Sequence, residues 1–189
     1  MRQERKMDLH VHVATGLLEG VRQVLSPHRD LRPPGMTPDL IVMHNISLPP
    51  GQFGDAWIEK LFTGSLPRDA HPYFATIQGR VSAHLLVRRD GELVQFVPFA
   101  LRAWHAGVSR YEGREACNDF SIGIEMEGTD EMPFTDAQYE AAATAIRALL
   151  AAYPTLSAAR IAGHSDIAPG RKTDPGPAFD WAALRSRLT

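Results

Sequence analysis

Leu40-Ile41-Val42-Met43-His44-Asn45 sets the predicted fold: four apolar residues are followed directly by two polar ones. A continuous apolar run of this length predicts a buried strand. The run ends in a histidine, and α/β proteins place binding groups at the carboxyl ends of such strands. His44 is therefore the first candidate functional residue.

Further strands are predicted towards the C-terminus. The apolar-rich runs 82–87 and 92–97 flank Arg88-Arg89-Asp90-Gly91, and Asp-Gly between two such runs predicts a β-hairpin. Residues 121–127 alternate with period two, so that Glu125 lies on the polar face of a strand. Residues 158–163 form another short strand. The hairpin argues against a purely parallel sheet.

Helices alternate with these strands. Helical spacing of apolar residues predicts a helix capped by Asp55 and running through Phe62, an Ala/Leu-rich helix over 135–153 and a closing helix over 179–188. We also expect a short helix over 15–25, and the alternation over 9–13 suits either a weak strand or a tag-like extension. The interleaving predicts the α/β class, as one domain with a central mixed β-sheet flanked by helices. We place an N-terminal extension at 1–25, packed on or near a domain formed by 26–189.

Composition excludes several classes of partner. The formal net charge is −2 and there is no long basic run, which argues against nucleic acid. No stretch approaches the ~20 apolar residues of a membrane helix, and Asp8, His10 and His12 interrupt any signal-like run at the N-terminus. Cys117 is the single cysteine, so no disulfide can form within the chain. We expect a cytoplasmic monomer.

A second polar stretch, Gly163-His164 to Pro175-Gly176, suggests a metal site. Asp174 follows His164 by ten positions, and Lys172 stands two residues before that aspartate. A hydrolytic zinc site uses three protein ligands and leaves one position open. His44, His164 and Asp174 supply that number.

Two further residues suit hydrolysis at such a site. Glu125 could take a proton from the attacking water and pass it to a leaving nitrogen. Lys172 could stabilise the oxyanion of a tetrahedral intermediate.

Each of these residues also has a simpler interpretation. A histidine at a strand end is commonly structural, and Asp174 before Pro175-Gly176 suits a turn. Lys172 suits a solvated surface, and Glu125 an exposed strand position. None of the spacings is as specific as a Cys-x-x-Cys pair, so the residues alone leave both interpretations open.

Six blocks of the sequence resemble the AmpD-type N-acetylmuramoyl-L-alanine amidases, within the wider family that includes peptidoglycan recognition proteins. They occur in the expected order between about Ser26 and Trp181. The blocks are His44–Gly51, Ala70–Phe74, Arg80–His84, Arg102–Gly107, Asn118–Glu125 and Gly163–Gly176.

The resemblance implies a fold, a reaction and a site. The fold is that of the amidases and peptidoglycan recognition proteins. The reaction is hydrolysis of the amide between N-acetylmuramic acid and L-alanine in anhydro-muropeptides, in cytoplasmic peptidoglycan recycling that indirectly controls β-lactamase induction. His44, His164 and Asp174 fall on the ligands of one Zn²⁺ per chain. Glu125 falls on the proton shuttle and Lys172 on the oxyanion-stabilising lysine.

Substrate contacts are predicted at Asn45, Arg80, Trp104 and His105. Asn45 follows a ligand and suits contacts with substrate or with residues that support the ligands, or else a turn. Trp104 and His105 suit a sugar or peptide cleft, or else a packed tryptophan beside a hydrogen-bonded histidine. Arg80 suits a bidentate contact to a peptide carboxylate, or a surface ion pair.

Two other functions compete with this one. A non-catalytic muropeptide-binding module would usually replace a metal ligand, whereas this chain keeps all three together with Glu125 and Lys172. An exported or phage enzyme would act on the intact cell wall, and comparing soluble muropeptide with intact sacculi as substrates separates that possibility.

Overall fold

The computed structural model describes residues 9–189, and a six-stranded mixed sheet lies at their centre, in the order β12-β5-β11-β6-β7-β3. The strands are β3 (Arg22–Gln23), β5 (Leu40–Ile46), β6 (Leu85–Val87), β7 (Leu93–Gln95), β11 (Ser121–Glu127) and β12 (Ile161–Gly163). β5 pairs in parallel with both β12 and β11, and β6 lies parallel to β11. Only the β6–β7 hairpin is antiparallel within this sheet.

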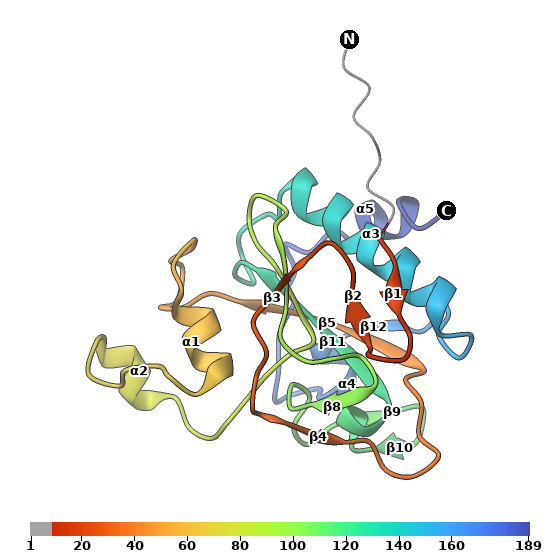
Figure 1. The fold of residues 1–189 in the computed structure, drawn as a ribbon. Coiled ribbons are helices and arrows are strands. Elements are labelled where there is room, and N and C mark those ends of the chain that lie inside the picture. The colour runs from red at the N-terminus through yellow and green to blue at the C-terminus, as the bar shows by residue number, and fades with distance from the viewer. Residues whose placement is uncertain (1–8) are drawn as a thin grey trace.

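Shorter elements surround the sheet (Figure 1). Three two-stranded ribbons pair β1 (Val11–His12) with β2 (Leu17–Leu18), β4 (Arg29–Leu31) with β8 (Leu101–Ala103), and β9 (Arg110–Tyr111) with β10 (Arg114–Glu115). The helices are α1 (Trp57–Thr63), α2 (Pro72–Thr76), α3 (Asp136–Ala152), α4 (His164–Ile167) and α5 (Trp181–Ser186), with a 3₁₀ turn η1 (Cys117–Asp119). Among residues 9–189 no helix has the length and apolar character that crossing a membrane requires.

The predicted α/β class with a mixed sheet is confirmed, and so is the hairpin around Asp90-Gly91. The helix predicted over 15–25 is wrong, because β2 and β3 occupy that segment. Gly16 and Gly20 take left-handed backbone angles there, with φ of 70° and 77°. The Gln95 side chain accepts a hydrogen bond from the Leu18 amide, which ties the segment to the sheet.

Smaller differences lie at element ends and at the N-terminus. The first helix starts one residue later than predicted, because Ala56 rather than Asp55 precedes it as the cap. The strand expected over 9–13 is present as β1. Residues 1–8 of the predicted N-terminal extension lie outside the described residues, and the division at residue 26 stays a prediction.

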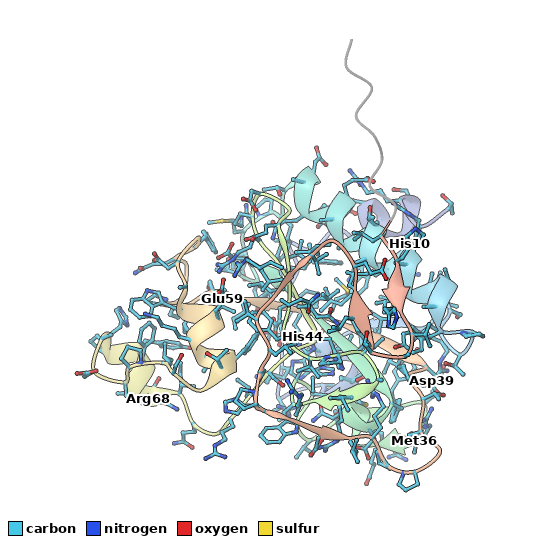
Figure 2. All side chains as sticks on the ribbon, viewed as in Figure 1. His10, Met36, Asp39, His44, Glu59 and Arg68 are labelled. Atoms are coloured by element: carbon cyan, nitrogen blue, oxygen red, sulfur yellow. The ribbon has the colours of Figure 1, made fainter. Side chains whose placement is uncertain are left out.

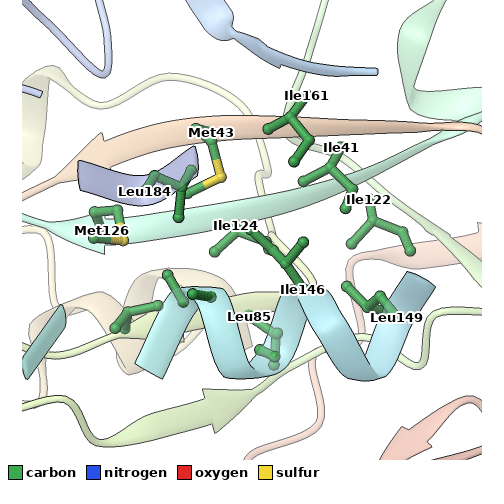
Figure 3. Packing of buried hydrophobic residues seen from close by; sticks show 14 of the residues in the cluster. Ile41, Met43, Leu85, Ile122, Ile124, Met126, Ile146, Leu149, Ile161 and Leu184 are labelled. Atoms are coloured by element: carbon green, nitrogen blue, oxygen red, sulfur yellow. The ribbon is translucent and has the colours of Figure 1, made fainter. Parts of the chain in front are cut away.

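One face of the sheet packs against α3 and forms the main core. Ile122, Ile124 and Met126 alternate along β11 and are fully buried against the helix. Figure 3 shows them beside Ile146 and Leu149 of α3. The helix begins at a capping box in which Thr135 and Gln138 exchange side-chain-to-backbone hydrogen bonds.

The opposite face of the central strands is buried under loops and carries polar groups. Ser121, Gly123 and Glu125 alternate with the core residues along β11 and are all buried. Figure 2 shows His44, from the same region, near the middle of the molecule, whereas Glu59 lies with α1 at one side. This second face holds the candidate site.

Candidate metal centre

Strand register brings three functional side chains into one row. Glu125 of β11 is the direct partner of His44 on β5. Gly163 of β12 pairs with Met43 of β5, so His164 and His44 each follow a paired residue at neighbouring strand ends. Parallel strands present paired residues on the same face, which places the carboxylate and both imidazoles side by side.

Asp174 joins this row from a loop. The chain passes through α4 and returns, and the Ser165 amide donates a hydrogen bond to the Asp174 carbonyl at 2.9 Å. The Asp166 side chain accepts a hydrogen bond from the Gly163 amide and so fixes the start of α4. These two contacts fix the start of α4 and the return of the loop that places Asp174 against both histidines.

The three side chains form a triangle of donor atoms. The His44 Nδ1–His164 Nδ1 distance is 3.0 Å, and Asp174 Oδ2 lies 3.0 Å from each of these nitrogens. Ligand atoms at ~2.0–2.2 Å from a tetrahedral zinc stand roughly 3.3 Å apart. Two imidazoles and one carboxylate also form a donor set that zinc accepts. The triangle therefore fits a metal ion.

The protonation states suit the same ion. Burial lowers the pKa of His44 to about 4, with a smaller opposing effect from its hydrogen bond to Asp174. Burial alone would raise the pKa of Asp174, but its contacts with His164 and His44 outweigh this and hold that pKa well below its usual range. A neutral imidazole and an ionised carboxylate are the forms that bind metals.

Glu125 faces this triangle as a buried carboxyl group. It is 8% exposed, and among residues 9–189 its Oε2 has no hydrogen-bond partner. Burial raises its pKa well above the usual range, and nearby Asp174 adds to that shift while Lys172 opposes it. Glu125 is therefore not the exposed strand carboxylate of the simpler interpretation. A buried, unpartnered carboxyl group beside metal ligands is placed to exchange a proton.

A cavity of about 640 Å³ opens over the triangle. Lys172 lines it as an exposed residue of the same loop that supplies Asp174. Tyr73 of α2 lines the cavity as well, 41% exposed. All five predicted metal and catalytic residues thus share one cavity.

The predicted substrate residues divide between two cavities. Asn45 and His105 line the cavity over the triangle, whereas Arg80 and Trp104 line a neighbouring one of about 400 Å³. The Trp104 ring stacks on His28 there, with 5.8 Å between ring centroids.

The contacts of Asn45 are structural. Its amide group donates to Asp130 Oδ1 at 2.6 Å and to the Pro175 carbonyl at 3.1 Å. These bonds join the end of β5 to the segment after β11 and to the loop that carries Asp174.

Sequence reasoning missed two residues of the site. Tyr73 lies inside a block used for the family resemblance. Its position directly after Pro72, at the start of a helix, is the sequence feature that could have drawn attention to it. Arg171 donates to the carbonyls of Ala106 and Val108, and it lies directly before Lys172. No pattern in the sequence indicates that contact.

Comparison with known proteins identifies the class. The profile of the N-acetylmuramoyl-L-alanine amidase family matches residues 34–177, a span that contains the triangle, Glu125 and Lys172. The chain belongs to this family of amidases.

Individual relatives make the comparison more specific. The 1,6-anhydro-N-acetylmuramyl-L-alanine amidase AmpD of Escherichia coli K12 is 64% identical over 171 residues, which cover 90% of this chain and 93% of that protein. A crystal structure of a selenomethionine AmpD derivative matches with a TM-score of 0.90 and 60% identity, over 93% of this chain and 98% of the other.

A more distant relative is seen with a substrate. The E. coli amidase AmiD, in complex with anhydro-N-acetylmuramic acid-L-Ala-D-γ-Glu-L-Lys, matches with a TM-score of 0.60 and 29% identity. The match covers 82% of this chain and 60% of that one.

Proposed function

We propose that this chain is a zinc-dependent amidase that hydrolyses the bond between anhydro-N-acetylmuramic acid and L-alanine in muropeptides. The observation that carries the proposal is the His44–His164–Asp174 triangle, with all three donor-atom distances at 3.0 Å and Glu125 in register beside it. The names of the AmpD relatives and the ligand of the AmiD complex support the choice of substrate.

His44, His164 and Asp174 would hold one zinc ion per chain. Bound there, zinc would supply a Lewis acid and would acidify a water molecule. Glu125 would take the proton from the attacking water and deliver it to the leaving amide nitrogen. A raised pKa suits that second step, because the carboxyl group must hold the proton before giving it up.

Lys172 would donate to the oxyanion that develops on the attacked carbonyl. Its loop position, two residues from Asp174, brings its charge to the cavity that the scissile amide would enter. Arg80 and Trp104, in the neighbouring cavity, would contact a more distant part of the muropeptide.

Within a cell we propose that the enzyme works as a cytoplasmic monomer on recovered wall fragments, and thereby limits β-lactamase induction. The high identity to AmpD amidases along most of both chains supports this role over that of an exported enzyme. Cleavage of soluble anhydro-muropeptide without cleavage of intact sacculi is the expected result, and rapid solubilisation of sacculi would contradict it.

Metal analysis combined with product identification tests the chemistry. We expect one zinc per chain and release of the intact peptide from an anhydro-muropeptide, with both lost in His164→Ala. His12→Ala is the matched control, because His12 is exposed and is not one of the three ligands. This variant should keep both the zinc and the activity. Full activity of zinc-free protein in excess chelator would overturn the proposal.

A further inference from the structure

His105 lies behind His44 and has both ring nitrogens engaged. Its Nδ1 is 2.9 Å from His44 Nε2, and its Nε2 is 3.2 Å from Ser121 Oγ. The residue is 9% exposed. These contacts leave neither nitrogen for a substrate, and they agree with the alternative interpretation of His105 as a hydrogen-bonded histidine.

A series of hydrogen bonds runs from the Cys117 carbonyl through Ser121 and His105 to His44. The carbonyl at its start determines which group donates in each bond. The Cys117 carbonyl can only accept, so the Ser121 hydroxyl donates to it, at 2.6 Å. Ser121 Oγ must then accept from His105 Nε2–H. A neutral imidazole has one proton, so His105 Nδ1 accepts from His44 Nε2–H. The His44 Nδ1 lone pair is thereby left facing the triangle.

The Ala106 carbonyl determines the ring tautomer of His164 in the same way. His164 Nε2 lies 3.2 Å from the Ala106 carbonyl, which can only accept a proton. Arg171 Nη2, which can only donate, lies farther from the same nitrogen, at 3.4 Å, and makes its shorter contacts with carbonyl oxygens. With the Ala106 carbonyl as the nearer partner, His164 Nε2 carries the proton and His164 Nδ1 faces the triangle as a lone pair. Arg171 donates to the same carbonyl at 2.7 Å and fixes its direction.

The segment 105–106 is itself held in place. Asn118 Oδ1 accepts hydrogen bonds from both of its amides, at 3.1 Å for His105 and 2.8 Å for Ala106. The His105 ring lies against Gly123, where an added Cβ would stand 2.5 Å from the ring. A side chain at position 123 would therefore displace the ring.

We propose that His105, through Ser121, and the Ala106 carbonyl set the ring tautomers of His44 and His164, so that both present a free Nδ1 to the zinc ion. His105 is then a positioning residue. The inference rests on the proposed zinc function. Partners behind metal-ligating histidines typically contribute ~10–100-fold in metal affinity.

Zinc affinity, measured by competition with a chromogenic chelator at one fixed pH, tests the series. In Ser121→Ala, His105 loses its acceptor and can move its proton to Nδ1, which would compete with the His44 proton. We expect zinc affinity about tenfold weaker than wild type. Ser26→Ala is the matched control, because Ser26 is equally buried, donates to the Phe62 carbonyl and accepts from an amide, yet touches neither ligand.

Two substitutions at position 105 distinguish a role of His105 in orienting His44 from a role in packing alone. His105→Asn keeps an oxygen acceptor near the place of Nδ1, whereas His105→Leu removes it. We expect His105→Leu to weaken zinc binding by ~10–100-fold and His105→Asn to recover most of that loss. Thermal unfolding of the zinc-free proteins identifies a variant that simply fails to fold, and Ser121→Ala then carries the test.

Nitrogen-15 NMR of the zinc-loaded wild type gives an independent readout, with the His105 proton expected on Nε2. A His105 proton on Nδ1, or Ser121→Ala binding zinc as tightly as Ser26→Ala, would overturn the inference while leaving the amidase function intact. Absence of zinc binding by the wild type would instead count against the proposed function.

Discussion

The two faces of the central sheet differ in what their burial requires. On the α3 face, β11 presents Ile122, Ile124 and Met126, which need only apolar neighbours of the right volume. On the other face, the alternating residues Ser121 and Glu125 are equally buried but polar. Ser121 Oγ is held there by two specific partners, His105 and the Cys117 carbonyl, whereas Glu125 Oε2 has no partner among residues 9–189.

Alternate residues of β11 therefore serve different roles: one set packs in the core and the other lies at the candidate site. Substitutions on the α3 face should change the free energy of unfolding and leave catalysis alone. Substitutions on the opposite face should do the reverse. Three predictions test that separation, beginning with the largest effect, and a fourth concerns the effect of pH on stability.

Glu125→Gln should lower kcat by ~10²–10⁴-fold, because the amide cannot accept and return a proton. Zinc content should remain at the wild-type value, since Glu125 is not one of the three donors of the triangle. Steady-state kinetics on an anhydro-muropeptide and metal analysis of the same sample measure both. Glu131→Gln, at an exposed position, is the control. A variant with normal kcat would show that the proton moves by another route.

Ile124→Ala, one residue away on the α3 face, should destabilise the fold by about 2–5 kcal/mol through loss of packing and a cavity. Urea unfolding measures this, and kcat should stay close to wild type under conditions where the variant is folded. Ile124→Val should cost about 0.5–1.5 kcal/mol. A large drop in kcat for the folded Ile124→Ala protein would mean that the two faces are not independent.

Lys172→Met should lower kcat by ~10²–10³-fold with a smaller change in KM, because the oxyanion exists only along the reaction path. Stability should hardly change, since Lys172 is exposed. Lys60→Met, whose ammonium group lies over the Trp57 ring, provides a control outside the cavity. A Lys172→Met effect confined to KM would assign the lysine to substrate binding instead.

Stability should fall as the pH falls from about 6.5 towards 3 in zinc-free protein. Burial lowers the pKa of His84 from 6.5 to about 3, so in this range the unfolded chain binds a proton that the folded chain does not. One such histidine gives a slope of at most about 1.4 kcal/mol per pH unit. Urea unfolding across this range should show a shallower slope for His84→Gln than for wild type. The exposed-site variant His12→Gln should keep the wild-type slope.

Sequence reasoning predicted the central strands well, because these depend on local patterns. The three candidate metal ligands that it proposed lie together in the structure. The apolar run before His44 and the alternation around Glu125 each identify a strand and a face. Register was not predictable, since nothing local states that Glu125 pairs with His44. The helix wrongly predicted over 15–25 failed for a related reason, because contacts with Gln95 outweigh local propensity.

The roles of single polar residues were the hardest to predict. For His105 the sequence left open a substrate contact or a hydrogen-bonded histidine, and could not name the partners of its ring, which are His44 and Ser121. Arg80 and Trp104 line a separate cavity from the triangle. Side-chain partners across loops follow from the packed structure, and composition or spacing does not reveal them.

The separation of the ligands along the chain also has a consequence for folding. His44 and His164 are 120 positions apart, and His44 and Asp174 are 130 apart. Contacts at such separations close large loops and form late. A metal ion that needs all three donors would therefore bind only after β5 and β12 have paired, and would stabilise the native state without assisting its formation. At a free concentration of 100 times its Kd, such an ion would add about 2.7 kcal/mol to the stability of the native state.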